Sequence, residues 1–258
     1  MIKNKLILGA AALGLLATTS FASQADMLFG VHGEVQYWQA KNDGGFSTTQ
    51  NTDDWAWDGE GATRLSLSLN HFVPLIPNVM IERQLLKSSG TLPHTEDYII
   101  GNSSFPAPTD GTSALLNTTW DLGHDTLTLY YRLFDNSLVQ FFFGVSAKKY
   151  NGDMSVNIGG QTLRKDINQT IPMGYVRLTA GLPFSGLSLR AQGHPISLGD
   201  HDSYDMEASL RYEFLDTLAL DGILSIGYRT LSLKLDNASG LYTDFEVKGP
   251  FVNLSLHF

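Results

Sequence analysis

The sequence predicts an all-β fold, a transmembrane antiparallel up-and-down β-barrel of about ten strands. First, segments in which apolar and polar residues alternate recur from residue 27 to the end of the chain. Second, the gaps between these segments alternate between long polar stretches and short turns. Third, the 258 residues include no cysteine and no apolar run long enough for a transmembrane helix. A closed barrel satisfies its backbone hydrogen bonds within its own ladder, so it needs neither disulfides nor helices.

The first 25 residues have the three-part layout of a secretory signal peptide. Lys3 and Lys5 precede an apolar run at residues 6–16, and the small residues Ser23 and Ala25 occupy positions −3 and −1 before a cleavage site that precedes Asp26. We therefore expect residues 1–25 to direct export and residues 26–258 to form the barrel. Because the leader carries two lysines and no acids, its removal changes the net charge from −9 to −11. Such an acidic protein is a poor nucleic-acid binder, and we expect no nucleic-acid partner.

The alternating segments account for the strand count. Long gaps follow the first, third and fifth segments, and short turns lie near residues 74–78, 135–137, 183–186 and 215–219. Eight strands is the alternative, because two segments are imperfect: Arg83 shares a face with apolar residues, and the alternation changes phase near Arg229, where we expect a β-bulge. The ten segments are residues 27–39, 64–70, 79–87, 126–133, 139–148, a sixth ending at 176–180, 187–192, 204–214, 223–235 and 242–258.

The last strand carries the most informative pattern. Val252, Leu254, Leu256 and Phe258 share one face, and polar residues separate them. In this pattern the chain resembles bacterial outer-membrane β-barrels, in which a last strand ending in Phe is the signal for the barrel-assembly machinery. The alternative, an edge strand of a soluble β-sandwich, does not explain the export signal or the alternating gap lengths. The resemblance implies a Gram-negative outer-membrane location, with outer-membrane lipid, lipopolysaccharide and the assembly machinery as partners.

A closer resemblance involves one hairpin. Residues 128–136 (TLYYRLFDN) and 143–148 (FGVSAK) look like a poorly characterised group of γ-proteobacterial outer-membrane proteins named for a Gly-Gly. This resemblance implies no catalytic residues, and we expect no cofactor.

The polar faces of the strands predict what fills the barrel. Acidic and basic side chains in a narrow, poorly hydrated interior are expected to pair, because an unpaired buried charge is costly. We therefore expect a lumen filled by side chains and a structural or surface-interaction role. A narrow porin-like channel for small solutes is the alternative, although no ring of single-sign charge is visible. The candidates for the lumen network are Glu34, Arg64, Arg132, Arg177, Arg190, Glu207, Arg211 and Glu213.

A hydrolase at the barrel rim, either an outer-membrane protease or a lipase, is the less favoured alternative. Asp53-Asp54 and Asp200-His201-Asp202 have suitable residue types, but adjacent strand residues point to opposite faces, and no Gly-x-Ser-x-Gly occurs. We therefore expect no enzyme activity.

The first long gap is acidic and also contains Trp55 and Trp57. We expect a solvated surface there, with a divalent-cation site that bridges to lipopolysaccharide phosphates or to a receptor-type ligand as the alternative. No Ca²⁺-loop spacing supports a defined metal site. The acidic residues are Asp43, Asp53, Asp54, Asp58 and Glu60, followed in the next gap by Glu96, Asp97 and Asp110.

Overall fold

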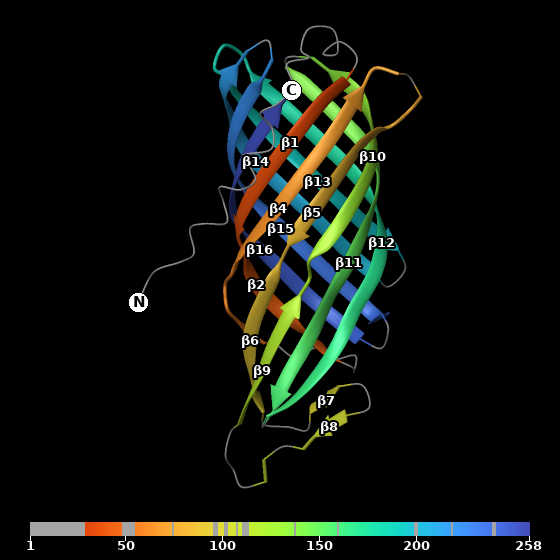
Figure 1. Cartoon of the computed structure of the whole chain (residues 1–258), viewed down its shortest axis with the longest axis vertical. Coiled ribbons are helices and arrows are strands. Elements are labelled where there is room, and N and C mark those ends of the chain that lie inside the picture. Colours follow the sequence, from red (N-terminus) through yellow and green to blue (C-terminus); the bar gives the residue numbers. More distant parts are fainter. Residues whose placement is uncertain are drawn as a thin grey trace.

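Antiparallel strands close into one barrel in the computed structural model (Figure 1). The structure describes residues 29–47, 55–73, 75–94, 98–100, 103–106, 108–109, 114–136, 138–158, 160–198, 201–217, 219–238 and 241–258. The predicted signal peptide, residues 1–25, lies outside these ranges. Among the described residues, no helix has the length and apolar character to cross a membrane.

The barrel has ten strands, four of which are interrupted, so that the sheet contains 14 segments. The interrupted strands are β1–β2, β3–β4, β5–β6 and β9–β10, and β7 and β8 form a separate hairpin. The segments are β1 (Phe29–Gln39), β2 (Lys41–Ser47), β3 (Ala56–Trp57), β4 (Gly61–His71), β5 (Asn78–Leu85), β6 (Lys87–His94), β7 (Tyr98–Ile100), β8 (Ser103–Phe105), β9 (Ala114–Asp121), β10 (His124–Asp135), β11 (Val139–Ile158), β12 (Gln161–Leu182), β13 (Leu187–Leu198), β14 (His201–Asp216), β15 (Asp221–Ala238) and β16 (Leu241–His257).

The first and last strands close the barrel. β1 pairs with β4 on one side and with β16 on the other. Val31 and Phe258 also exchange backbone hydrogen bonds of 3.1 and 2.9 Å, so the ladder continues to the last residue. The prediction of ten strands is confirmed, and the eight-strand alternative is wrong.

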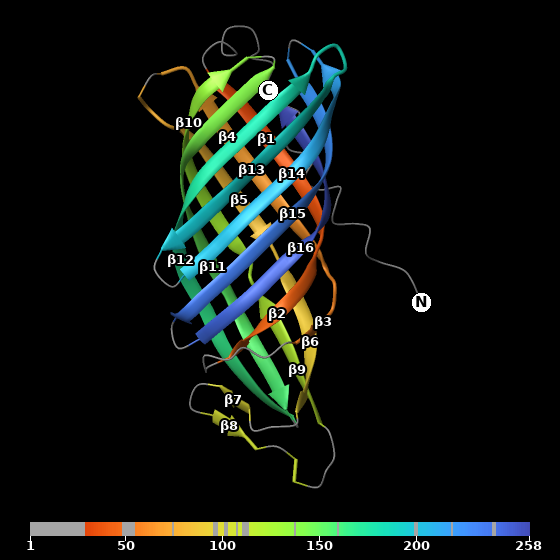
Figure 2. The same cartoon turned by 180° about the vertical axis from the view of Figure 1, so that it is seen from behind.

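Short turns join β4 to β5, β10 to β11, β12 to β13 and β14 to β15, all at the end where the chain terminates (Figures 1 and 2). We call this the turn end. The opposite end, where the β7–β8 hairpin lies, is the loop end. The four turns match those predicted from the sequence.

The two faces of the barrel wall exchange character part of the way along the strands. In β15, the outward residues near the turn end are Leu224, Ile226 and Tyr228, and Ser225 and Arg229 point inward. Beyond Arg229 the outward residues are polar, and the inward ones are apolar. β11, β12 and β16 invert in the same way. The turn half is therefore apolar outside and mostly polar inside, with one small buried cluster of Met80, Tyr130, Phe142 and Tyr175, and the loop half is the reverse.

This inversion corrects the expected β-bulge at Arg229. The register of β15 with both neighbours is continuous through Arg229, with irregularities at Glu213/Leu215 of β14 and near Ala238. Leu231 and Leu233 leave the outward apolar row because they enter an apolar interior. The prediction assumed a polar interior along the whole strand, and that assumption fails beyond Arg229.

Arg83, the other irregularity, is on the outer wall as the alternation implied. Its guanidinium lies 3.2 Å from the Asp125 carboxylate of the neighbouring strand β10. The exposed ion pair with Asp125 therefore accommodates the charge of Arg83 among the apolar outward residues of β5.

The interior of the loop half is a hydrophobic core built largely from aromatic side chains. Trp55 is 5% exposed and stacks on Phe46 with ring centroids 5.1 Å apart, and the Trp57 indole donates a hydrogen bond of 2.7 Å to the Gly44 carbonyl. The two tryptophans of the predicted acidic loop therefore lie inside the molecule, contrary to the expected solvated surface. The other large members are Trp38, Trp120, Tyr150, Met154, Ile171, Met173, Leu231, Leu233, Phe245, Val247 and Phe251.

Deleting Phe258 should lower the yield of folded barrel more than Phe258→Ser does. The deletion removes both the aromatic ring and the backbone pairing with Val31, and the substitution removes the ring alone. Phe184→Ser, which changes a fully exposed Phe in a turn at the same end, is the matched control and should assemble normally. Heat-modifiable migration of outer-membrane fractions measures the yield. Normal assembly of the deletion variant would contradict a role for the terminal residue.

Candidate functional site

The described interior of the turn half holds three successive layers of polar side chains. The layer next to the hydrophobic core is centred on Arg229. Its Nε and Nη2 donate to the two Asp205 oxygens at 2.8 and 2.7 Å. Its Nη1 donates to Gln36 at 3.1 Å and to Gln84 at 2.7 Å, and the Lys148 ammonium donates to Asp205 at 2.7 Å. Five strands, β1, β5, β11, β14 and β15, therefore meet in one buried network.

The second layer is centred on Arg64 and Glu207. The Arg64 Nη2 lies 2.8 Å from a Glu207 oxygen, and its Nε lies 3.6 Å from Glu82. Gln192 and Gln36 also donate to Glu207, at 2.8 and 3.1 Å. Because Gln36 contacts both Arg229 and Glu207, the first two layers form a continuous hydrogen-bonded unit.

In the same layer, a serine, a histidine and a glutamate lie in a row, each next to the following one in space. The Ser146 hydroxyl lies 2.9 Å from His194 Nδ1, and His194 Nε2 lies 3.4 Å from Glu82. These residue types match a nucleophile, base and acid. All three are buried, and Glu82 also faces Arg64, which makes the group part of the packed network. The spacing of these residues in the sequence does not predict this contact, because Ser146 and His194 are 48 residues apart on different strands.

The third layer lines a cavity of about 490 Å³ near the turn end, which we call the vestibule. Arg190 Nη1 lies 3.0 Å from Glu34, and the Arg177 guanidinium lies 4.2 Å from the Phe142 ring centroid. Arg211 lines the same cavity from the neighbouring strand. Its other lining residues are Gly30, His32, Asn70, His71, Phe72, Arg132, Gln140, Glu213, Asp221, Ile223, Ser255, Leu256 and His257.

The predicted lumen residues fall into three groups. Arg64 with Glu207 and Arg190 with Glu34 form direct ion pairs. Arg177 and Arg211 are buried in the vestibule, whereas Arg132 and Glu213 lie at its exposed rim. The sequence prediction omitted the central residues of the first layer: Lys148, Asp205 and Arg229. The phase change at Arg229 was the signal that could have identified this layer.

The predicted rim residues are only partly described. Asp53, Asp54 and Asp200 lie outside the described residues, as do Glu96, Asp97 and Asp110, and the side chains of His201 and Asp202 are not described. Within the described part of the chain, no group of three His, Cys, Asp or Glu side chains is arranged to hold a metal ion.

Two residues of the acidic stretch contact other parts of the chain near the loop end. The Lys248 ammonium lies 2.7 Å from Glu246 and 3.1 Å from Asp43, and these hydrogen bonds raise the pKa of Lys248. The Ser89 hydroxyl donates to the Asp58 carboxylate at 2.9 Å. Asp43 and Asp58 therefore have partners within the chain.

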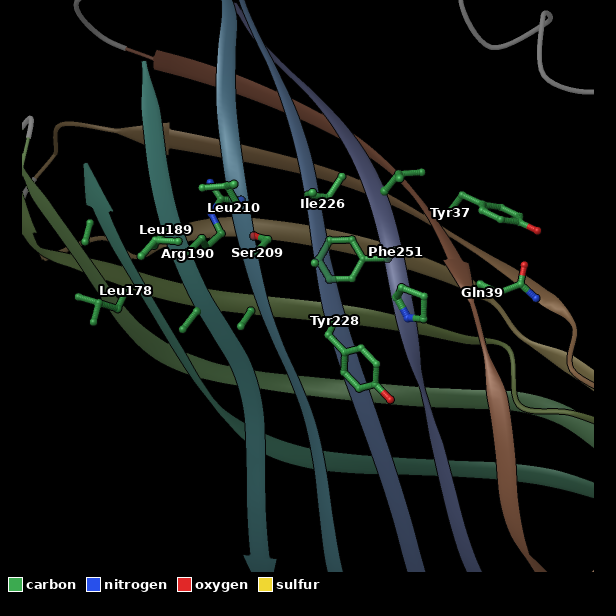
Figure 3. A pocket seen from close by; sticks show the side chains of 16 residues that line it. Tyr37, Gln39, Leu178, Leu189, Arg190, Ser209, Leu210, Ile226, Tyr228 and Phe251 are labelled. Carbon is green, nitrogen blue, oxygen red and sulfur yellow. The ribbon is translucent and has the colours of Figure 1, made fainter. Parts of the chain in front are cut away.

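A groove of about 1030 Å³ runs over the outer wall of the turn half (Figure 3). The small residues Ala191 and Ala208, which pair in register, leave a depression between larger side chains such as Leu189, Leu210 and Tyr228. The outward side chains along it are mostly apolar. The groove is suited to hydrocarbon chains, and its lining shows no arrangement of catalytic side chains.

Comparisons with known proteins give structural likeness without close sequence relatives. No protein-family model matches the chain, and no curated protein matches it significantly. The outer-membrane protease OmpT from Escherichia coli is 9% identical, with 94% of this chain and 99% of that chain covered and a TM-score of 0.45. The attachment invasion locus protein Ail of Yersinia pestis is 9% identical, with 90% and 100% covered and a TM-score of 0.36. Neisserial surface protein A is 10% identical, with 89% and 95% covered and a TM-score of 0.32.

At these identities and scores, the likeness carries no inference about activity or ligands. The resemblance to the Gly-Gly group stays a prediction from the sequence, because no family model matches.

Asp205→Asn should lower the free energy of unfolding by about 3–5 kcal/mol, because it leaves Lys148 and Arg229 buried together without their carboxylate. Asp125→Asn, which breaks the exposed pair with Arg83, is the matched control and should cost less than about 1 kcal/mol. Denaturant midpoints of the refolded proteins measure both effects. Equal midpoints for the two variants would show that the buried network does not hold the barrel together.

Proposed function

We propose that this protein is an outer-membrane β-barrel of a Gram-negative bacterium, with a filled lumen and a structural or surface-interaction role. The single observation that carries the proposal is the closure of the interior by two barriers of opposite character. Ion pairs and hydrogen bonds fill the middle of the barrel around Arg229, and the aromatic core fills the loop half.

The outer wall of the turn half supports the membrane location. Large exposed apolar side chains are informative because a soluble surface rarely gathers so many of them. With the predicted export signal, this belt fits outer-membrane lipid as the surrounding solvent, and the turn end then faces the periplasm. The belt includes Val35, Leu65, Leu67, Leu129, Val145, Leu178, Leu189, Leu210, Ile226 and Val252.

The lengths of the strands support a role at the cell surface. A transmembrane strand needs about 9–11 residues, whereas β11 has 20 and β12 has 22. The surplus belongs to the loop half, where the outer face is polar and the core is apolar, as in a soluble domain. With the turns in the periplasm, this half projects outward as a rigid platform. The platform offers contact to lipopolysaccharide or to a protein outside the cell, and assembly uses the last strand.

A closed interior also argues against the channel alternative. A solute that entered the vestibule would have to disrupt the Arg229 network and then cross a core centred on Trp38, Trp120 and Phe245. The polar groups of the first barrier are bonded to one another and buried, and the second barrier is apolar, so neither is expected to admit hydrated solute.

The purified protein should be electrically silent in planar lipid bilayers at protein loads where a general porin gives many channels. The physical reason is the cost of moving an ion from water through an apolar core. Discrete conductance steps that scale with the amount of folded barrel would contradict the closed lumen and favour the channel.

Neither ester hydrolysis nor lipopolysaccharide deacylation should exceed the detergent background, because Ser146 is packed beneath neighbouring side chains. Ser146→Ala and His201→Asn are the informative variants, one for each candidate group. Turnover by the wild-type protein that is lost in either variant would establish an enzyme and overturn this part of the proposal.

A further inference from the structure

The vestibule brings three arginines together on one wall. Arg177, Arg190 and Arg211 come from the consecutive strands β12, β13 and β14, and β13 pairs with both of its neighbours. Arg177 and Arg211 are 8% and 6% exposed, and the side chain of Arg190 is 10% exposed. The three side chains line a cavity that is open toward the turn end but largely screened from water.

Each of these arginines keeps an unused donor. The Nε atoms of Arg177, Arg190 and Arg211 are buried and have no hydrogen-bond partner among the described residues. A buried guanidinium donor without a partner is costly, and native proteins leave few of them. Three such donors on one wall show that the described chain supplies too few acceptors for these guanidinium groups, whose side chains also line the cavity.

The charges of the vestibule are also unbalanced. In the two deeper layers, three cations face three carboxylates: Arg64, Lys148 and Arg229 against Glu82, Asp205 and Glu207. In the vestibule, the three arginines share one buried carboxylate, Glu34, which Arg190 and Asn253 already contact.

The two other carboxylates that line the vestibule do not restore the balance. Asp221 lies 3.1 Å from His257 and is engaged there, and Glu213 is at the exposed rim. The inner wall therefore carries an excess of positive charge where the cavity is most enclosed.

We propose that the vestibule binds a small oxyanion between Arg177, Arg190 and Arg211. The planar guanidinium fork matches the oxygens of phosphate, sulfate and carboxylate groups, and buried charge-assisted hydrogen bonds of this kind are strong. A volume of about 490 Å³ accommodates such a group on a small organic molecule. The ligand is a soluble anion or a lipid phosphate that enters from the periplasmic end.

The wall of the vestibule opposite the three arginines carries polar groups that would orient a bound ligand. His32 stacks on His257 with ring centroids 3.9 Å apart, and its Nε2 lies 2.7 Å from the Asn70 amide. These fixed polar edges face the same cavity and would contact the part of the ligand that lies away from the arginines.

Isothermal titration of the refolded barrel in zwitterionic micelles, with inorganic phosphate or sulfate as the probe, tests the site. One saturable site per barrel is expected, with an affinity that falls as sodium chloride is raised. Arg177→Gln and Arg211→Gln should each weaken binding roughly 10- to 100-fold. Arg83→Gln, an exposed arginine of the outer wall, is the matched control and should bind like the wild type.

A second arm identifies the source of the anion. The same titration is run in nanodiscs of phosphatidylcholine alone and of phosphatidylcholine mixed with phosphatidylglycerol. A lipid head group that occupies the vestibule would compete and weaken phosphate binding in the mixed discs, and this competition would be absent in Arg211→Gln. Equal affinity in both discs assigns the site to a soluble anion.

Two results would overturn the proposal. One is the absence of saturable phosphate and sulfate binding to the wild-type protein in micelles and in both kinds of disc. The other is an affinity unchanged in both arginine variants. If Arg211→Gln does not fold, Arg211→Lys replaces it, because lysine keeps the charge but loses the fork. Binding several-fold weaker than wild type is then expected, and wild-type affinity in a folded Arg211→Lys would contradict the fork.

Discussion

The Arg229 guanidinium is the centre of a network that joins five strands across the barrel interior, and the rest of the structure depends on this network. The guanidinium saturates both oxygens of Asp205, reaches Gln36 and Gln84, and lies 4.7 Å from the Trp38 ring centroid. Removing two charges from water is costly unless the geometry satisfies every donor, and here Lys148 and the two amides complete the network. The network also marks the height at which the interior changes from polar to apolar.

That change of interior explains both the fold and the proposed role. In the turn half, lipid is the expected solvent of the outer wall, so apolar side chains point outward and polar ones fill the lumen. In the loop half water takes the place of lipid, and the same strands reverse their faces. Tyr228 and Leu231 are three residues apart on β15, yet one lies on the outer wall and the other in the core. Under the proposed function, one set of strands therefore builds a membrane anchor and a water-exposed platform without a linker.

Much of the fold could be predicted because strand periodicity is local. The ten strands, the four short turns and the closure of the last strand on the first all follow from alternation and turn residues. The hydrophobic core of the loop half could not be recognised while the lumen was assumed to be polar throughout. Leu231 and Leu233 then looked like a slipped register, and Trp55 looked like a loop residue, because alternation does not say which face is inside.

The interior contacts were less predictable than the strands. The residue types on the polar face, such as Arg64 and Glu207, indicated a network, but these two are 143 residues apart and meet across the lumen. Such pairings depend on strand register and tilt around the whole barrel, which a local pattern does not contain. The excess of arginine in the vestibule follows from the same geometry, since Arg177, Arg190 and Arg211 have one carboxylate, Glu34, among them.

The proposed function requires a lumen that is open at the turn end and closed at the Arg229 network. The chain contains no cysteine, so single cysteines report their own accessibility. A small anionic thiol reagent, which the positively charged vestibule attracts, should modify Ser255→Cys in the vestibule lining only when it is added on the turn side. It should leave Leu231→Cys, in the core beyond the network, unmodified from either side. Modification of Leu231→Cys in the folded barrel at a rate similar to that of Ser255→Cys would contradict a closed interior.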